Sequence, residues 1–479
     1  MLTLRSMARI LGDNRENFLP ADQAERSPAR VVVDSREIGL SDLFVCIRGE
    51  RQDGHDFAFQ AAERGATAIL AEKDPFAGKI PPLPLLRVSD SVQALQLLAA
   101  EYRSSFRGRV AGITGSAGKT SIKEVLAEVL SVRGKTSRNF MNRNNRIGLP
   151  ISILNADAEA SFWVLEAGIS EKRDMDELGR VLKPDLGLIL NVGPAHLSGL
   201  GDRGAAYYKA RLLTYLQPEG CALISADYPE LLRESAAVRA DFFTFSACRP
   251  EADYFAACKG QTASGRWLYR VRLRGAEFEA AAPFPGVYGA ENVAAISGAA
   301  QILGLSPSEI SAGLSRAVLP EQRFHCLTRG NFTLIDDSYN SNPLSAERML
   351  RSASEMARAA RSPLFLVMGD MLELGGESAQ AHRRLGREMA VSGARAVFWK
   401  GEQGEEVRAG LREGAFGGFF ADLREAEDFS AGLPALLDCL EKGAAGDPRG
   451  VILFKASRGL KLELLAEDFR KNFFCKIGI

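Results

Sequence analysis

The sequence predicts an α/β protein of three domains, which we place at residues 1–86, 87–319 and 320–479. From residue 87 to 319, short apolar runs alternate with helical stretches, and the same alternation returns after Leu319-Pro320. Such alternation is typical of a parallel sheet covered by helices. Shorter strand-like runs before residue 87 indicate a small α/β domain. The length of 479 residues suits this plan, since a domain typically takes about 100–200 residues.

Composition excludes several classes of protein. Lys and Arg number 60, as do Asp and Glu, so the chain lacks the basic surplus typical of a nucleic-acid-binding protein. The seven cysteines include no C-x-x-C pair, which favours a reducing compartment over a disulfide framework or a cysteine zinc site. We find no signal-peptide run at the N-terminus and no stretch near the ~20 apolar residues of a membrane span. The sequence therefore predicts a cytoplasmic protein with no membrane or nucleic-acid partner, and we expect a monomer.

Strand-like runs define the interior of each domain. The first domain ends in the Pro-rich stretch KIPPLPLL, which we interpret as an extended linker. The central domain contains a segment with period-2 patterning, Tyr254 to Pro285, which indicates an antiparallel insert. The expected strands are VVVDS, DLFVCI and ATAILAE in the first domain, RVAGIT, FWVLEAG, LGLILNVG and CALISA in the second, and FTLIDDSY, PLFLVMGD, ARAVFWKG and GVILFKAS in the third.

A glycine-rich segment, GITGSAGKTS, follows the first strand of the central domain and opens the predicted helix KTSIKEVLAEVL. Its glycines let backbone N–H groups surround phosphate oxygens, and the helix N-terminus adds positive charge. Lys119 would reach the β- and γ-phosphates, and the Thr120 hydroxyl would coordinate Mg²⁺. Ile113 stands where the usual pattern has its first glycine, and a turn that binds no nucleotide is the alternative. The predicted ATP-binding residues here are Thr114, Gly115, Ser116, Ala117, Gly118, Lys119, Thr120 and Ser121.

Glu166 and His196 follow the next two predicted strands of the central domain. Ligands of parallel sheets bind outside the carboxyl ends of the strands, so both side chains are expected at the crevice that holds the phosphate loop. Glu166 is a natural oxygen ligand for Mg²⁺. His196 is a less usual ligand, and a structural role is an equal alternative.

Three further polar segments lie near predicted strand ends. The asparagine-rich NFMNRNNRIGLP, with Asn144 and Asn145, suits peptide or sugar binding, or else forms a polar loop with Asx turns. DDSYNSNP follows the strand FTLI and suits a site or a helix N-cap. KASRG follows VILF and places Lys and Arg either at an anion-binding spot or on a solvated edge.

Together these segments resemble the Mur ligases of peptidoglycan synthesis, nearly from end to end. The matching segments are VVVDSREIGLSDLFVCIRGERQDGHDF, GITGSAGKTSIKE, NRNNRIGLP, NVGPAHLSGLG, YGAENVAAISGAA, RFHCLTRGNFTLIDDSYNSNP, VMGDMLELG and FKASRG. The resemblance implies an N-terminal domain that binds the UDP part of a substrate, a central P-loop ATPase domain with a parallel sheet, and a C-terminal Rossmann-like domain. It also implies ATP and Mg²⁺, an acyl-phosphate intermediate, and the substrates UDP-N-acetylmuramoyl-tripeptide and D-alanyl-D-alanine.

The resemblance also implies individual roles. Lys119, His196 and Lys209 are the expected catalytic residues, and Lys209 matches a lysine that is carbamylated in several Mur ligases. Here Lys209-Ala210 is followed by Arg211, where the family often has Glu. The expected metal ligands are Thr120, Glu166, His196 and carbamylated Lys209; nucleotide contacts also come from Asn292, Arg323 and Asp337, and substrate contacts from Ser35, Arg36, Asn144, Asn145, Asn340, Asn342 and Arg458.

Two other classes remain open from the sequence. A sister ligase that adds a single amino acid, or folylpolyglutamate synthase, would share the ATP motifs. A P-loop ATPase or GTPase switch would share the phosphate loop, but it would not need two further domains with substrate motifs. The formation of a ligated product from ATP and two peptides distinguishes these classes.

Overall fold

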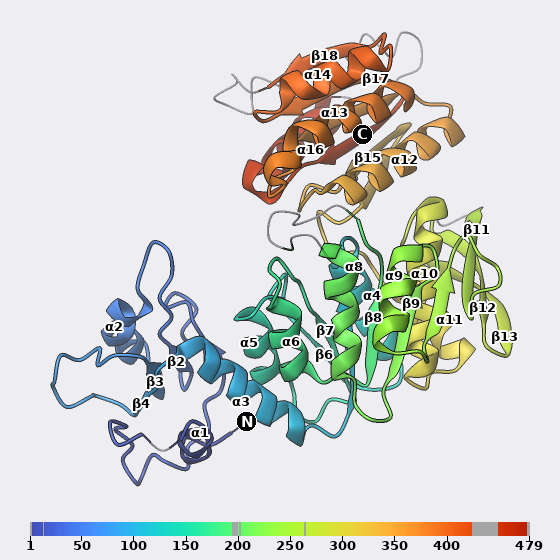
Figure 1. Ribbon diagram of the computed structural model, residues 1–479. Helices are drawn as coiled ribbons and strands as arrows, with labels where there is room; N and C mark the ends of the chain where they lie inside the picture. Colours follow the sequence, from blue (N-terminus) through green and yellow to red (C-terminus); the bar gives the residue numbers. More distant parts are fainter. Residues whose placement is uncertain are drawn as a thin grey trace.

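Three α/β units follow one another along the chain in the computed structural model, which describes residues 2–12, 14–193, 200, 203–262, 265–423 and 449–476 (Figure 1). Each unit has its own sheet: four strands in the first, nine in the second and six in the third. This arrangement confirms the predicted fold class. Among the described residues, no helix is both long enough and apolar enough to pass through a bilayer.

The N-terminal sheet is fully parallel, with its strands side by side in chain order. The strands are β1 (Val31–Val32), β2 (Leu43–Val45), β3 (Ala68–Ala71) and β4 (Leu85–Arg87), and the helices are α1 (Leu4–Ile10), the 3-10 helix η1 (Gly54–Phe57) and α2 (Ala58–Glu63).

The prediction of an extended linker at KIPPLPLL was wrong. Its end forms the edge strand β4, and Leu83, Leu85 and Leu86 are buried in this domain. Pro84 accepts a hydrogen bond from the amide of Ile69 through its carbonyl, which a proline without an N–H can still do at a sheet edge. The boundary predicted after residue 86 falls within β4.

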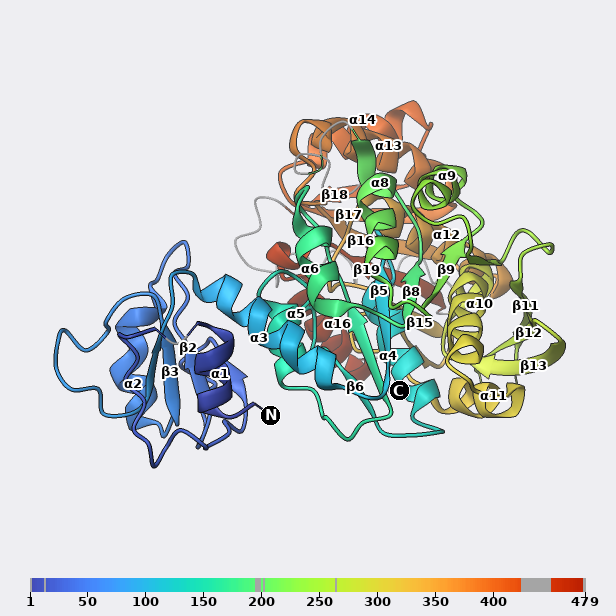
Figure 2. The ribbon, with the colours of Figure 1, turned by 60° about the horizontal axis from the view of Figure 1, so that its bottom comes forward.

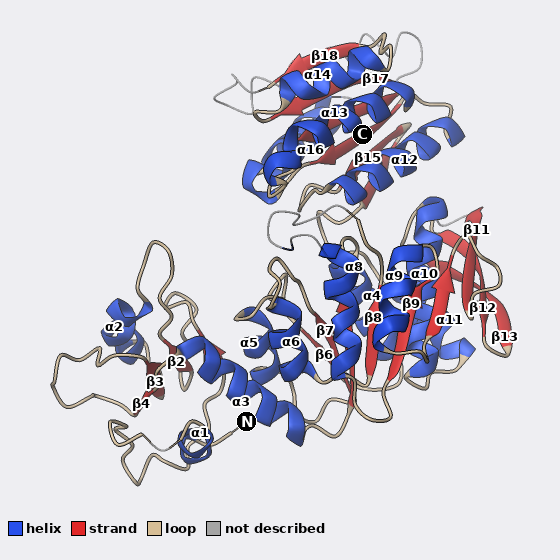
Figure 3. Ribbon diagram, viewed as in Figure 1, coloured by secondary structure: helices blue, strands red, loops and turns tan. Residues whose placement is uncertain are grey.

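The central sheet has helices on both faces, as Figure 3 shows. Successive residues of β5 point to opposite sides: Val110 packs with one apolar cluster, and Ala111 and Ile113 pack with the other. The strands are β5 (Arg109–Thr114), β6 (Thr136–Arg138), β7 (Phe162–Glu166), β8 (Leu186–Ile189), β9 (Cys221–Ser225), β10 (Phe243–Ser246), β11 (Tyr254–Gln261), β12 (Trp267–Leu273) and β13 (Ala276–Ala282), in the order β13-β12-β11-β10-β9-β8-β5-β7-β6.

The helices of this unit are α3 (Ser91–Ser105), α4 (Lys119–Leu130), α5 (Gly148–Leu154), α6 (Asp174–Leu182), α8 (Gly204–Ala210), the 3-10 helix η3 (Arg211–Tyr215), α9 (Pro229–Val238), α10 (Gly286–Ile302) and α11 (Pro307–Arg316). Strands β11, β12 and β13 are antiparallel neighbours, as the period-2 pattern predicts. They are not a separate insert, because β11 pairs with β10 and extends the main sheet.

The C-terminal sheet is parallel apart from its first edge strand, β14, which is antiparallel to β15. The boundary predicted at residues 319 and 320 falls between α11 and this strand. The strands are β14 (His325–Arg329), β15 (Phe332–Asp336), β16 (Leu364–Gly369), β17 (Ala394–Lys400), β18 (Phe419–Asp422) and β19 (Gly450–Lys455), in the order β14-β15-β19-β16-β17-β18, with α12 (Pro343–Ala359), η4 (Gly375–Glu377), α13 (Ser378–Val391), α14 (Gly404–Glu413), η5 (Arg458–Leu460) and α16 (Leu462–Lys476).

The second and third units meet where their parallel strands end. Figure 2 shows the C-terminal unit behind the central sheet, with the N-terminal unit to one side. Helix α12 contacts α10 across this interface. The carboxyl ends of β5 and β7 therefore share a crevice with those of β15 and β19, as expected for a ligand site of parallel sheets.

Candidate active site

The glycine-rich loop is held in shape by the loop that follows β8. Asn191 accepts a hydrogen bond from the amide of Ala117 (2.8 Å) and donates one to its carbonyl (3.1 Å). The amide of Ser116 donates to the carbonyl of Asn191 (3.1 Å). Gly118 has a φ of 80°, in the left-handed region that glycine adopts most readily, and α4 starts directly after it. The loop is thus ordered before any anion binds.

Lys119 lies at the start of α4 with its ammonium folded back over this loop. Its Nζ donates to the carbonyl of Gly115 (2.7 Å). Burial lowers the pKa of Lys119, Glu166 opposes this effect, and the nearby positive charge of Arg323 lowers the pKa further. A phosphate group in the cavity would supply the negative charge that stabilises both cations.

Thr120 and Glu166 form an oxygen-rich pair beside the loop. The Thr120 hydroxyl donates to Glu166 Oε2 (2.9 Å), and Asn144 Nδ2 donates to Oε1 (2.5 Å). Mg²⁺ prefers oxygen ligands and usually takes one or two protein groups beside phosphates and waters, so this pair fits the metal. Among the described residues no cluster of three His, Cys, Asp or Glu side chains is present.

The asparagine-rich loop is fixed from below by a buried lysine. Lys123 Nζ donates to the carbonyls of Asn139 (2.6 Å) and Met141 (2.9 Å), and Asn139 pairs with the backbone of Glu166. Asn145 Oδ1 accepts from the amide of Gly148, the first residue of α5 (2.8 Å). The loop thus has the Asx-turn character of the simpler alternative and still contributes residues 142, 144 and 145 to the cavity.

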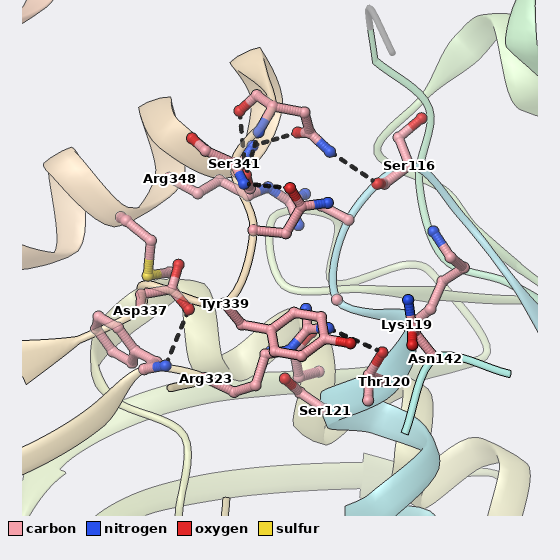
Figure 4. Close-up of a pocket in the computed structure, with 18 of the residues that line it drawn as sticks. Ser116, Lys119, Thr120, Ser121, Asn142, Arg323, Asp337, Tyr339, Ser341 and Arg348 are labelled. Atoms are coloured by element: carbon pink, nitrogen blue, oxygen red, sulfur yellow. Dashed lines mark hydrogen bonds between the residues drawn. The ribbon is translucent and has the colours of Figure 1, made fainter. Parts of the chain in front are cut away.

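The C-terminal unit brings three charged residues to the opposite wall. Arg323 lies between two residues with positive φ, Gln322 and Phe324, and donates to the Thr120 hydroxyl (3.3 Å), as Figure 4 shows. Asp337 Oδ2 accepts from the buried ammonium of Lys455 (2.6 Å). Burial lowers the pKa of Lys455, and Asp337 opposes the effect.

Tyr339 lies between two guanidinium groups. Its ring centroid is 3.9 Å from Cζ of Arg323 and 4.8 Å from Cζ of Arg458. Such cation–π contacts attract each guanidinium to the face of the ring. Arg458 therefore stands next to the cavity, although it is not part of the lining.

DDSYNSNP provides both a helix cap and a contact between the units. Asn342 is the N-cap of α12: its Oδ1 accepts from the amide of Ser345 (2.9 Å). Its Nδ2 donates to the carbonyl of Ser116 in the phosphate loop (3.1 Å). The carbonyl of Asn340 accepts from Lys455 (2.9 Å).

Most of these groups line one cavity of about 420 Å³ between the two units. The structure brings most of the predicted site residues into its lining, from both units. The predicted residues in the lining are Ser116, Ala117, Gly118, Lys119, Thr120, Ser121, Asn144, Asn145, Glu166, Asn292, Arg323, Asp337, Asn340 and Asn342.

Other predicted residues lie outside this lining. Thr114 is fully buried at the end of β5. The role of Gly115 is to accept, through its carbonyl, the hydrogen bond from Lys119. Ser35 and Arg36 lie in the N-terminal unit, where Arg36 is exposed and paired with Asp34 (2.6 Å). His196 falls outside the described residues.

Lys209 is deeply buried on α8. Burial, together with the positive charge of Lys119, lowers the pKa of Lys209 to about 7. The neighbouring Arg211 is directed to α6, where its Nε donates to Asp176 Oδ1 (2.7 Å). The departure from the family pattern at Arg211 is thus compensated by a local ion pair.

Sequence reasoning assigned no role to several lining residues, among them Asn142, Tyr339, Arg348 and Glu373. Three of them stand in segments already noted: Asn142 in NFMNRNNRIGLP, Tyr339 in DDSYNSNP and Glu373 in VMGDMLELG. Arg348 had no such signal, since it is one of several arginines in an amphipathic helix. Lys455, which also lines the cavity, is the lysine of KASRG, for which an anion-binding spot and a solvated edge were both considered.

A phosphate loop, a hydroxyl–carboxylate pair and cations supplied by a second α/β unit define a nucleotide-dependent enzyme of the P-loop class. Comparison with known proteins refines this class. Residues 29–103 match the family model described as "Mur ligase family, catalytic domain", residues 113–300 match "Mur ligase middle domain", and residues 322–458 match "Mur ligase, glutamate ligase domain".

The relatives extend over nearly the whole chain. The UDP-N-acetylmuramoyl-tripeptide–D-alanyl-D-alanine ligase of Bacillus subtilis (strain 168) is 31% identical over 91% of this chain and 92% of that protein. The crystal structure of MurF from Acinetobacter baumannii has a TM-score of 0.85 at 26% identity and covers 98% of this chain and 99% of that one. The MurF ligase of Thermotoga maritima in complex with ADP has a TM-score of 0.77 at 27% identity, over 93% and 98%. This chain belongs to the Mur ligase family, which confirms the sequence resemblance.

Proposed function

We propose that the chain joins UDP-N-acetylmuramoyl-tripeptide to D-alanyl-D-alanine through an amide bond, with ATP converted to ADP and phosphate. The observation that carries this proposal is the cavity between the central and C-terminal units. Its central-domain wall is a phosphate loop, and its other wall brings Arg323 within 3.3 Å of Thr120. Relatives that share nearly the full length are named for this reaction.

The nucleotide would lie between the phosphate loop and α10. Backbone amides of the loop and the N-terminus of α4 would bind the phosphates. Asn292 on α10 lines the cavity, and the amide is suited to read the edge of an adenine ring. Arg323 and Asp337 would contact the nucleotide from the C-terminal unit.

The first chemical step activates a carboxylate, which is itself a poor acyl donor. A carboxylate oxygen of the tripeptide attacks the γ-phosphorus. The bond between the γ-phosphorus and the β,γ-bridging oxygen breaks, and ADP leaves. Lys119 and Arg323 offset the negative charge that moves toward ADP. Mg²⁺, held by Thr120 and Glu166, would neutralise phosphate charge when bound.

The second step forms the amide. The neutral amine of D-alanyl-D-alanine attacks the acyl carbon and loses a proton, and the tetrahedral intermediate releases phosphate with the former carboxylate oxygen. We expect Asn340 and Arg458 to hold the acceptor carboxylate by hydrogen bonds. Both amide atoms of Asn342 are engaged within the protein, so we assign it to positioning.

The experiment that tests this chemistry follows an oxygen atom. The tripeptide is prepared with ¹⁸O in its terminal carboxylate and incubated with MgATP and D-alanyl-D-alanine. We expect one ¹⁸O atom in the released phosphate, measured by mass spectrometry. Phosphate that is labelled only when the solvent is H₂¹⁸O would indicate plain ATP hydrolysis and would exclude the proposed intermediate.

A further inference from the structure

An ion pair outside the reaction described above joins the two units that share the cavity. Arg348 on α12 donates through Nη2 to Glu291 Oε2 on α10 (2.6 Å) and to the hydroxyl of Tyr228. The side chains of Arg348 and Glu291 are 15% and 9% exposed. The pair thus has one partner in each unit, and both partners are largely removed from water.

Helix α12 has two different faces. The apolar face packs into the core of the C-terminal unit through Ala346, Leu350, Ala353 and Ala357. The face with Arg348 and Arg351 is turned to the central unit, where Cζ of Arg351 lies 5.6 Å from the ring centroid of Tyr288. Within this face the Arg348 side chain is largely buried against the central unit, whereas the Arg351 side chain is 57% exposed.

The ion pair lies on the same rigid elements as two groups of the site. Glu291 directly precedes Asn292, which lines the cavity. Arg348 lies about 9 Å along α12 from its N-cap, at roughly 1.5 Å per residue. That N-cap is Asn342, whose side chain contacts the phosphate loop. The orientation of α12 against α10 therefore determines where Asn342 stands relative to the loop.

We propose that Glu291 and Arg348 are a positioning pair that fixes the closed arrangement of the central and C-terminal units over the nucleotide. Closure removes both charges from water, and the cost is offset only when the two meet. With one partner neutralised, closure buries an uncompensated charge, and the open arrangement is favoured. With both neutralised, no charge is left unpaired. The inference rests on the proposed function for its kinetic readout and for the muramoyl-tripeptide ligand used in its structural readout.

The test uses the full-length chain with three variants: Glu291→Gln, Arg348→Met and the double variant. The matched control is the half-exposed pair Arg387–Glu413, which joins α13 to α14 wholly within the C-terminal unit. Glu413→Gln and Arg387→Met remove that pair and leave the residues of α12 unchanged. The radius of gyration is measured by small-angle scattering, without ligand and with a non-hydrolysable ATP analogue, Mg²⁺ and UDP-N-acetylmuramoyl-tripeptide.

We expect both control variants and the wild type to share the same compact ligand-bound radius, and each single interface variant to stay expanded. The kcat of ligation should fall about 10- to 100-fold in each single variant. The kcat of the double variant should be at least about tenfold higher than that of the less active single variant. The melting temperature without ligands should stay unchanged, since the pair does not stabilise either unit by itself.

Compact single variants with kcat within about twofold of wild type would overturn the proposal, as would a double variant whose losses simply add. If Arg348→Met fails to fold, Glu291→Gln keeps the side-chain volume and tests the same closure. A wild type that compacts with ligands but forms no amide would contradict the proposed function and leave the positioning pair supported.

Discussion

Lys119 has a fixed position, and its positive charge is destabilised by burial. Its ammonium is held by the Gly115 carbonyl, and burial lowers its pKa in the absence of an anion. The Lys119 ammonium therefore interacts most strongly with the phosphates of a bound nucleotide, while negative charge moves from the γ-phosphate toward ADP. Because Lys119 lies in the first turn of α4, its removal should cost the fold little.

We predict that Lys119→Ala lowers the kcat of ligation by about 10²–10³ while the circular dichroism spectrum and melting temperature stay unchanged. The matched control is Lys135→Ala, which removes a lysine of the same domain whose side chain is 67% exposed. Turnover near the wild-type level in Lys119→Ala would remove the phosphate-loop assignment.

Lys209 is suited to carbamylation because burial favours its neutral amine, the form that adds CO₂. A carbamate would replace a buried cation by an anionic oxygen. We predict that Lys209→Ala loses ligation and that formate or acetate partly restores it by supplying a carboxylate oxygen. Lys183→Ala, at the C-cap of α6, is the control. An inactive Lys209→Ala that short acids leave inactive at all concentrations would count against the carbamate.

Single residues show what sequence reasoning can and cannot reach at this scale. The phosphate loop was recognisable because its residues are contiguous. Asp337 and Lys455 are separated by more than a hundred positions, and only the parallel register of β15 and β19, with Asp336 opposite Phe454, makes them neighbours. No local pattern specifies that pairing, so Lys455 was noted only as part of a strand end.

At the scale of elements, α12 depends on Asn342 in two separable ways. Oδ1 caps the helix, and Nδ2 contacts Ser116 of the phosphate loop. Asp is as good an N-cap as Asn, but it cannot donate to a carbonyl. This difference allows one position to be tested for each role.

We predict that Asn342→Ala destabilises the C-terminal unit by about 0.5–2 kcal/mol, whereas Asn342→Asp keeps its stability. Both variants should lose ligation by about tenfold or more, because the contact with the loop is absent in both. Chemical denaturation and steady-state kinetics measure the two effects. Full activity in Asn342→Asp would show that the contact with Ser116 is dispensable.

Helix α11 begins with a capping box that carries a titratable group. Glu309 accepts hydrogen bonds from Arg133 (2.6 Å) and from the amide of Ser306 (2.8 Å), and its pKa is lowered to about 2. A carboxylate whose pKa is lowered in the folded state stabilises the fold at pH values above its ordinary pKa of 4.5. That contribution is lost as the pH falls from 4.5 toward 2.

We predict that Glu309→Gln is less stable than wild type at pH 6 and that the difference shrinks steadily below pH ~4.5. Thermal unfolding across this pH range measures it. Glu279→Gln, at an exposed position on β13 of the same unit, is the control. A stability difference that is constant from pH 6 to pH 3 would exclude the ionised carboxylate as its source.

Element types were largely predictable, because apolar runs and their spacing are local. The helix expected at KTSIKEVLAEVL spans Lys119–Leu130 as drawn from the sequence. The Pro-rich stretch misled because proline is compatible with both a linker and an edge strand, and only the neighbouring strand β3 decides between them.

At the scale of the whole molecule, the site exists only where two sheets bring their strand ends together. Neither unit has a complete cavity: the central one supplies the loop and Glu166, and the C-terminal one supplies Arg323, Asp337 and Lys455. Sequence patterns predicted three α/β units. They did not predict the interface between the units, because that contact depends on tertiary packing. A closed site of this kind also excludes water from an acyl phosphate.

The central claim is that this closed site ligates a dipeptide. In a dipeptide the carboxylate lies one residue further from the amine than it does in a single amino acid. When the amine of a single amino acid is placed at the acyl carbon, its carboxylate therefore does not reach a site that binds the carboxylate of a dipeptide. The most direct measurement compares D-alanyl-D-alanine, D-alanine, D-glutamate and meso-diaminopimelate as acceptors with MgATP and UDP-N-acetylmuramoyl-tripeptide, and follows both ADP release and the mass of the product. We predict that D-alanyl-D-alanine gives one ADP per amide formed and that each single amino acid is a poor acceptor. A single amino acid that outperforms the dipeptide would contradict this account, even if ATP-dependent ligation itself occurs.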